Sequence, residues 1–217
     1  MDSELSEALQ QKAAISEILR AISNSPTNAQ SVLDTVAEAA ARLCDVTNVE
    51  IFQAEGEDVR LVAKFGHYRI WPIGFSFRIS RDLVVGRTIA ERISVHVDDL
   101  QTAAEFPQGA AYARQYGHRT VFATPLLREG VAIGAILIRR LEVRPLTDNQ
   151  IALLKTFADQ AVIAIENVRL FNEVREKSRK VEDQARELAE WNAALEIRVA
   201  EQVHKVEQLS KLEHELS

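Results

Sequence analysis

The stretch that follows Thr147 constrains the fold of this chain more than any other feature. It contains no proline and no glycine up to Ser217, which predicts one continuous helix. Thr147 and Gln150 form a candidate capping box at its start. At a rise of 1.5 Å per residue the helix would be about 105 Å long. No single small domain covers that length, so the distal part needs a partner helix or it frays.

A seven-residue repeat runs through the distal part of this helix and indicates a coiled coil. The frame holds without interruption from Phe171 to Leu216, and position d carries leucine or valine at six of its seven sites. The predicted dimer interface of this tail consists of Phe171, Val174, Val181, Leu188, Asn192, Leu195, Val199, Val206 and Leu209.

Asn192 occupies an a position and favours a parallel homodimer. A buried asparagine pairs well with its own symmetry mate and poorly with an aliphatic side chain, so it selects an in-register dimer at a cost in stability. Ser178 and Ala185, also at position a, predict that the rod is only marginally stable. We hypothesise that such a rod changes its packing when the preceding domain changes. The alternative is a surface helix that folds back on its own domain.

A second, shorter seam occupies residues 3–24. Its apolar positions follow spacings of three and four, and proline at position 26 ends the helix because it disfavours the α conformation in the preceding residue. The chain is therefore predicted to contain a coiled-coil helix over 1–25, a globular domain over 26–170 and a signalling coiled coil over 171–217. The first of these adds to the predicted dimer interface Leu5, Ile15, Leu19 and Ile22.

The central region changes from a helical to an alternating pattern. A helix over residues 27–45 is followed by alternating runs that predict two hairpins, over 49–65 and 120–139, and a short strand over 95–97. Weaker helical stretches cover 84–92 and 106–116, and an aromatic-rich loop covers 66–81. This order favours an α+β fold in which a sheet has its helices on one side.

Composition excludes several classes of function. The formal net charge is -6, whereas a protein that binds a nucleic-acid duplex normally presents a basic face, so no nucleic-acid partner is expected. No stretch reaches ~18 consecutive apolar residues, so no membrane span is expected. The acidic start is unlike a secretory signal, and a cytoplasmic location is predicted. The one cysteine, Cys44, is interpreted as a small buried hydrophobe.

Several stretches resemble the GAF domains of bacterial signalling proteins. The two most specific, when found together and in this order, are Ile-Gly-Ala-Ile at 133–136 and Phe-Ala-Asp-Gln-Ala-Val-Ile-Ala-Ile-Glu-Asn at 157–167. Residues 190–203 resemble the helical linkers that join such domains to an output domain, commonly a nucleotide cyclase, a serine phosphatase or a histidine kinase. The resemblance implies a sensory module that relays a small-ligand or conformational signal along the C-terminal coiled coil to an output domain outside this chain.

The resemblance also implies a five- or six-stranded antiparallel sheet with a small-molecule pocket under the loop and the short helices. An aromatic-rich cavity with a few polar groups is typical of small-ligand sites. The alternative is that these side chains fill the space beneath the loop, which would make the chain a ligand-free dimerisation spacer. The ligand-binding residues that the resemblance implies are Phe65, Tyr68, Trp71, Phe75, Phe77, Val85, Ile89, Phe122 and Thr124.

No known ligand chemistry of this family can be assigned from the residues. The Asn-Lys-Phe-Asp-Glu signature of cyclic-nucleotide-binding members is missing, and Cys44 lies too early in the chain for covalent bilin attachment. A single cysteine cannot form the disulfide of members that reduce methionine sulfoxide. His67 is the best candidate for a haem or iron ligand, but no two histidines share metal-ligand spacing on a helix. We therefore predict no required cofactor, no metal site, no catalytic residue and no enzymatic activity.

Overall fold

The computed structural model describes residue 16 and the ranges 29–66 and 71–215. Apart from residue 16, the predicted N-terminal helix lies outside these residues, and so does the start of the helix predicted over 27–45. The same holds for the predicted site residues Leu5, Ile15, Leu19, Ile22 and Tyr68.

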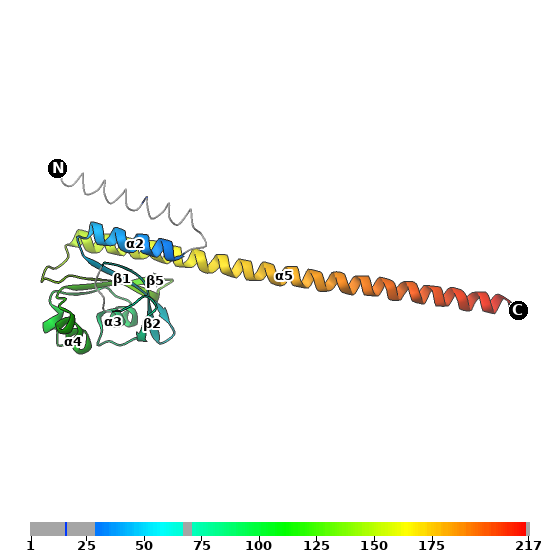
Figure 1. Cartoon of the computed structure of the whole chain (residues 1–217), viewed down its shortest axis with the longest axis horizontal. Helices are drawn as coiled ribbons and strands as arrows, with labels where there is room; N and C mark the ends of the chain where they lie inside the picture. The colour runs from blue at the N-terminus through cyan, green and yellow to red at the C-terminus, as the bar shows by residue number, and fades with distance from the viewer. Residues whose placement is uncertain (1–15, 17–28, 67–70, 216–217) are drawn as a thin grey trace. The chain divides into compact units, whose positions relative to one another are not determined.

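The globular part of the chain contains one antiparallel sheet of six strands, in the order β3-β2-β1-β6-β5-β4. Figure 1 shows this sheet with β1, β2 and β5 labelled. Both predicted hairpins are confirmed, since β1 pairs with β2 and β5 pairs with β6. The three-residue strand β3 lies within the predicted loop and is too short to show an alternating pattern. The strands are β1 (Asn48–Glu55), β2 (Asp58–Phe65), β3 (Ser76–Arg78), β4 (Val95–Val97), β5 (Val121–Arg128) and β6 (Val131–Arg139).

Two long helices cover one face of this sheet. They are α2 (Ala29–Leu43) and the first turns of α5 (Asp148–Glu215). Cys44 is fully buried beside them, and this burial raises the pKa of its thiol to about 12, which confirms its interpretation as a buried hydrophobe. The core on this face includes Val36, Ala40, Val49, Ile51, Phe122, Ile136, Ile138, Leu154, Phe157 and Ala161.

Short elements cover the opposite face. They are α3 (Val84–Glu91), the 3-10 helix η1 (Leu100–Thr102) and α4 (Pro107–Tyr116). Gly117 ends α4, with a left-handed φ of 85° that glycine adopts without a steric penalty. The expectation of helices on one side is therefore incomplete, because it holds only for the long pair.

Strand β6 lies in the middle of the sheet and is buried on both faces. Leu137 belongs to the core under α3 and α4, whereas Ile138 belongs to the core under α2 and α5. This alternation continues into two consecutive arginines, Arg139 and Arg140, which are only 5% and 4% exposed. Arg139 therefore points to the side of α3 and α4, and Arg140 points to the side of α2 and α5.

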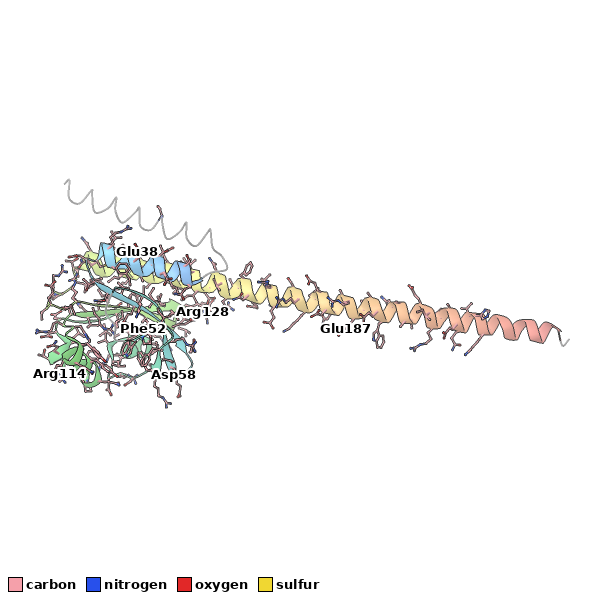
Figure 2. All side chains as sticks on the ribbon, in the orientation of Figure 1. Glu38, Phe52, Asp58, Arg114, Arg128 and Glu187 are labelled. Atoms are coloured by element: carbon pink, nitrogen blue, oxygen red, sulfur yellow. The ribbon has the colours of Figure 1, made fainter. Side chains whose placement is uncertain are left out.

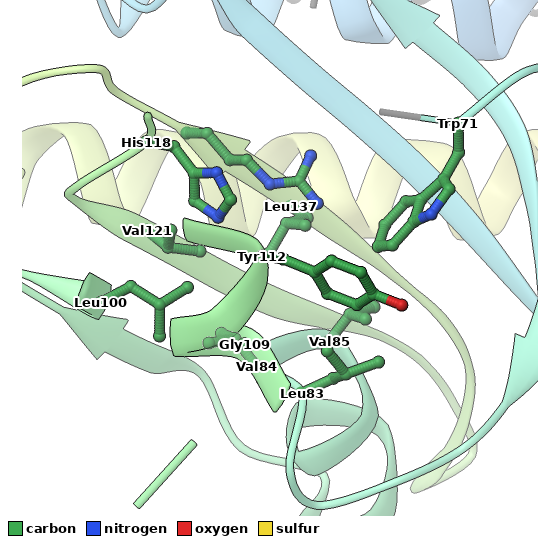
Figure 3. Close-up of a pocket in the computed structure, with 11 residues that line it drawn as sticks. Trp71, Leu83, Val84, Val85, Leu100, Gly109, Tyr112, His118, Val121 and Leu137 are labelled. Atoms are coloured by element: carbon green, nitrogen blue, oxygen red, sulfur yellow. The ribbon is translucent and has the colours of Figure 1, made fainter. Parts of the chain in front are cut away.

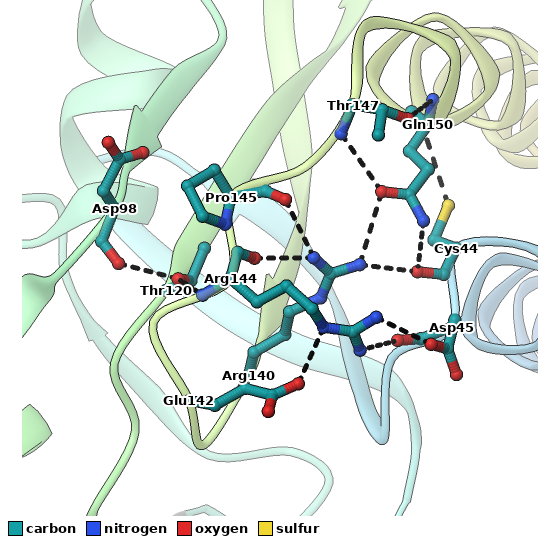
Figure 4. A network of polar contacts seen from close by, with 10 residues as sticks. All are labelled: Cys44, Asp45, Asp98, Thr120, Arg140, Glu142, Arg144, Pro145, Thr147 and Gln150. Carbon is teal, nitrogen blue, oxygen red and sulfur yellow. Dashed lines mark hydrogen bonds and ion pairs between the residues drawn. The ribbon is translucent and has the colours of Figure 1, made fainter.

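Arg140 donates hydrogen bonds to backbone oxygens from separate segments (Figure 4). Nη1 donates to the carbonyls of Arg144 and Pro145 at 2.6 and 3.0 Å, and Nη2 donates to the carbonyl of Cys44 at 2.8 Å. Nη2 also lies 3.3 Å from Oε1 of Gln150, whose Nε2 donates to the same Cys44 carbonyl at 2.8 Å. Arg140 thus joins the end of α2, the loop before α5 and the first turn of α5.

Gln150 also forms the capping box predicted for α5. The N–H of Thr147 donates to Oε1 of Gln150 at 3.1 Å, and the N–H of Gln150 donates to Oγ1 of Thr147 at 3.3 Å. These bonds satisfy two backbone donors that the helix itself leaves unpaired. One side chain therefore both starts α5 and contacts Arg140.

The chain divides into two compact units, Met1–Arg169 and Leu170–Ser217. In the second unit, side chains project on both sides of the helix in the view of Figure 2, and Asn192 is exposed. Leu209 lies in the same helix. The pairing of this surface with a second chain stays a prediction. Its apolar side chains are between 40% and 65% exposed at Phe171, Val174, Val181, Leu188, Leu195, Val199 and Val206.

Replacement of Arg140 by methionine is expected to lower the free energy of unfolding by about 3–5 kcal/mol, because several buried carbonyl groups lose their donors. Arg144→Met is a matched control. Arg144 is half-exposed and forms ion pairs with Asp45 and Glu142, so its loss should cost less than about 1 kcal/mol. Urea denaturation followed by circular dichroism measures both values, and equal losses would contradict this role of Arg140.

Candidate ligand-binding site

A cavity lies between the sheet and the short elements on the face opposite to α2 and α5 (Figure 3). The space inside it that a water-sized molecule can occupy is about 20 Å³, far below the roughly 300–1,000 Å³ of typical small-molecule sites. With the side chains as they stand, the interior admits about one water-sized molecule. The lining residues are Trp71, Leu83, Val84, Val85, Leu100, Gly109, Tyr112, His118, Val121, Leu137 and Arg139.

Several elements contribute to the lining. The sheet supplies Val121 from β5 and Leu137 from β6, and α4 supplies Gly109 and Tyr112. The N–H of Gly109 donates to the carbonyl of Asp82 at 2.9 Å. This hydrogen bond joins α4 to the segment before α3.

Trp71 is the centre of an aromatic cluster beside the cavity. Its ring stacks on Phe75 with centroids 5.6 Å apart, and it lies 4.9 Å from Phe77. Phe52 and Tyr112 meet it edge-on at 6.0 and 5.8 Å. Offset and edge-on contacts of this kind are the favoured arrangements of aromatic rings. They hold Trp71 as a flat, buried wall of the cavity.

A buried ion pair lies next to this wall. Arg139 pairs with Glu50 of β1, and their side chains are 5% and 4% exposed. The guanidinium carbon of Arg139 is also 5.3 Å from the centre of the Trp71 ring, within the range of a cation–π contact. Strand pairing places Glu50 opposite Leu137, so both charges project from the cavity face of the sheet.

His118 is a buried lining residue with a strongly lowered pKa. Burial, and then the positive charge of Arg139, lower the pKa of His118 to about 3. The imidazole is therefore neutral near pH 7, and a neutral imidazole has one donor and one acceptor nitrogen. The cavity wall thus combines an uncharged polar ring with a charge pair that sums to zero.

The structure brings part of the predicted site together. Trp71 and Val85 line the cavity. Phe75 and Phe77 contact the Trp71 ring, and Ile89 packs in the same core. These aromatic residues of the loop lie together at this wall, because a large buried ring such as Trp71 packs against other rings or apolar side chains.

The structure places the other predicted strand residues elsewhere. Phe122 packs under α2 and α5, and Thr124 follows it by two residues and points the same way, with its Oγ1 3.0 Å from Oγ of Ser94. Phe65 is exposed and does not line the cavity. These three assignments are corrected. In β5 the cavity side is that of Val121, and a shift of one residue along a strand moves every side chain to the other face.

Several lining residues were not predicted. Leu83, Leu100 and Tyr112 come from short elements whose positions depend on tertiary packing. The burial of Arg139 could have been predicted from the sequence, because Arg139 directly follows a long apolar run in a strand. A buried arginine requires a partner, which points to an acidic residue on the neighbouring strand.

The described residues contain no group of three histidine, cysteine, aspartate or glutamate side chains that could hold a metal ion. Cys44 lies in the other core, and its raised thiol pKa disfavours the nucleophilic thiolate. The chemistry that the cavity offers is apolar contact, ring stacking and a few hydrogen bonds.

A profile of the GAF domain matches residues 28–165, a range that includes α2, the whole sheet and the cavity. The chain belongs to the GAF domain family. A comparison with curated protein sequences finds no match. In the described part of the chain no helix is both long and apolar enough to span a membrane.

Several solved structures have a similar fold. A segment of a methyl-accepting chemotaxis protein is 24% identical, with a TM-score of 0.61 over 73% of this chain and 98% of that one. The GAF domain of a phosphoenolpyruvate-protein phosphotransferase from Coxiella burnetii is 15% identical, with a TM-score of 0.65 over 76% and 98% of the two chains. A phycoerythrobilin-bound GAF domain of a cyanobacterial phytochrome is 16% identical, with a TM-score of 0.63 over 76% and 99%. At these identities the similarity establishes the fold alone.

The buried His118 is expected to make this GAF domain less stable as the pH falls. Its pKa of about 3 in the folded protein lies below the ordinary value of 6.5, so between these pH values the unfolded chain binds a proton that the folded chain does not. The contribution of His118 therefore lowers the free energy of unfolding as the pH falls below about 6.5, by up to about 1.4 kcal/mol per pH unit.

Urea denaturation of the wild type and of His118→Gln at pH 7 and pH 5 measures this contribution. The wild type should lose about 2 kcal/mol more than the variant between the two pH values. The same pH dependence in both proteins would show that His118 is not held neutral in the folded state.

Proposed function

We propose that this GAF domain is the sensory module of a signal-transduction protein and that its cavity binds a small molecule. The observation that carries the proposal is the cavity itself. It is mostly apolar, has one aromatic wall, and contains a few polar groups, His118, Tyr112 and Arg139, at fixed positions. This combination is typical of sites for small organic ligands.

The proposed signal leaves the cavity through the end of β6. Arg139 lines the cavity, and the next residue, Arg140, contacts Gln150 in the first turn of α5. A ligand that shifts Arg139 would move the same short piece of backbone that holds Arg140. A shift of the cavity wall would therefore reach the helix at the first turn of α5.

The C-terminal helix is proposed to carry this signal as a parallel homodimer to an output domain outside this chain. The exposed seam from Phe171 to Val206 and the asparagine at position 192 support this proposal. The domain would then act as a regulator and not as an enzyme.

A ligand-free dimerisation spacer is the second candidate. The observation that favours it is the narrow interior of the cavity, which admits about one water-sized molecule. In that case the aromatic cluster would be core packing only.

Thermal unfolding in the presence of nucleobases, nucleosides, cyclic nucleotides and small aromatic compounds separates the two candidates. A ligand at 100 times its Kd should stabilise the protein by about 2.7 kcal/mol, which raises Tm by roughly 5–10 °C for a domain of this size. Leu137→Trp fills the cavity and should abolish the shift. Val131→Trp, on the exposed end of the same strand, should not. If no compound raises Tm, the spacer is favoured.

Cysteine crosslinking tests the proposed dimer. In a Cys44→Ala background, Leu188→Cys and Leu195→Cys should each form interchain disulfides, because equivalent d positions face each other in a parallel dimer. Asp183→Cys, at the outward f position of the same frame, is the matched control and should remain monomeric on a denaturing gel. If neither position-d variant crosslinks, the parallel dimer is excluded.

A further inference from the structure

The charges around the cavity cancel. Of the lining residues in the described part of the chain, Arg139 is the one with a permanent charge, and it is paired with the buried carboxylate of Glu50. His118 is neutral near pH 7. Lys64 donates to the carbonyl of Trp71 at 3.0 Å but does not line the cavity.

The pairing of β1 with β6 places the two opposite charges, Glu50 and Arg139, next to each other in the sheet. Glu50 lies in β1 and Arg139 lies in β6, and these two strands are neighbours at the centre of the sheet. Both side chains are at least nine-tenths buried. The carboxylate of Glu50 therefore neutralises the guanidinium of Arg139 and binds part of its N–H donors before any ligand binds.

An anionic ligand would meet an unfavourable environment in this cavity. It would lie beside an arginine that is already neutralised, or it would displace Glu50 and leave that carboxylate buried without a partner. Both outcomes place an uncompensated charge in a poorly solvated site, which is strongly unfavourable. An uncharged ligand avoids this cost.

The walls also favour a flat ligand. Trp71 and Tyr112 both line the cavity, and their rings contact each other edge-on with centroids 5.8 Å apart, so they form one aromatic surface that can attract a further ring. A guanidinium has five N–H donors, so Arg139 keeps donors that Glu50 does not use. Those donors suit a carbonyl or ring-nitrogen acceptor on the ligand.

We infer that Glu50 determines the ligand class of this cavity, which accepts an uncharged aromatic molecule with a hydrogen-bond acceptor and rejects an anion of the same shape. The inference rests on the proposed sensory function. It makes Glu50 a specificity-determining residue that acts through Arg139.

Two pairs of compounds test this, since each pair has the same ring and differs in charge: benzamide with benzoate, and nicotinamide with nicotinate. Binding is measured in the full chain by fluorescence of Trp71 in a Trp191→Phe background, which leaves one tryptophan. The starting protein should bind each amide at least about tenfold more tightly than its acid. Equal or tighter binding of the acids would overturn the inference.

Glu50→Gln leaves Arg139 without a counter-charge and should reverse the preference toward the acids. Glu55→Gln is the matched control, because Glu55 lies in the same strand and forms an exposed ion pair with Arg60 at 2.7 Å. The control should keep the original preference. A preference that is unchanged in Glu50→Gln would also overturn the inference.

The double variant Glu50→Gln with Arg139→Gln removes both charges, so it remains informative if Glu50→Gln does not fold. It should still bind the amides and not the acids, and binding of the acids would overturn the inference. If neither member of a pair binds, but another compound binds and is excluded by Leu137→Trp, the inference is wrong and the sensory function stands. If no compound binds at all, both fail.

Discussion

Two consecutive arginines, buried on opposite faces of the sheet, are the constraint on which the rest of the structure depends. β6 is a central strand with helices on both faces, and Arg139 and Arg140 at its end are only 5% and 4% exposed. Each must therefore find partners inside the protein. Arg139 pairs with Glu50 beside the cavity wall. Arg140 donates to the carbonyl of Cys44 and to the side chain of Gln150, and so joins the end of α2 to the start of α5.

This arrangement also shapes the electrostatics of the cavity. The ion pair of Arg139 with Glu50 is satisfied within the sheet, and the charge of Arg139 adds to the effect of burial in keeping the imidazole of His118 neutral. The cavity therefore offers hydrogen bonds without net charge. That property adds to the limit that its narrow interior sets on possible ligands.

The two units of the chain differ in how their apolar surface is covered. The first unit buries its apolar side chains in two cores on either side of one sheet. In the second unit Val174, Val181 and Leu188 are more than half exposed, and apolar surface repeated at this spacing is typical of a helix that pairs with another. The polar and small residues at position a keep the proposed pairing weak, which suits a helix that has to change its packing.

Local sequence determined the elements of this protein, and tertiary structure determined the site. The helical tail, its capping box at Thr147 and Gln150, and both hairpins follow from periodicity and capping, because those signals depend on residues close together in the chain. The choice of strand face in β5, the burial of His118 and the pairing of Arg139 with Glu50 depend on segments far apart in the chain. A shift of one residue, or a different neighbour for β1, would have placed other side chains in the cavity. The sequence alone does not contain those distances, since strand register and helix position are set by how the two cores pack together.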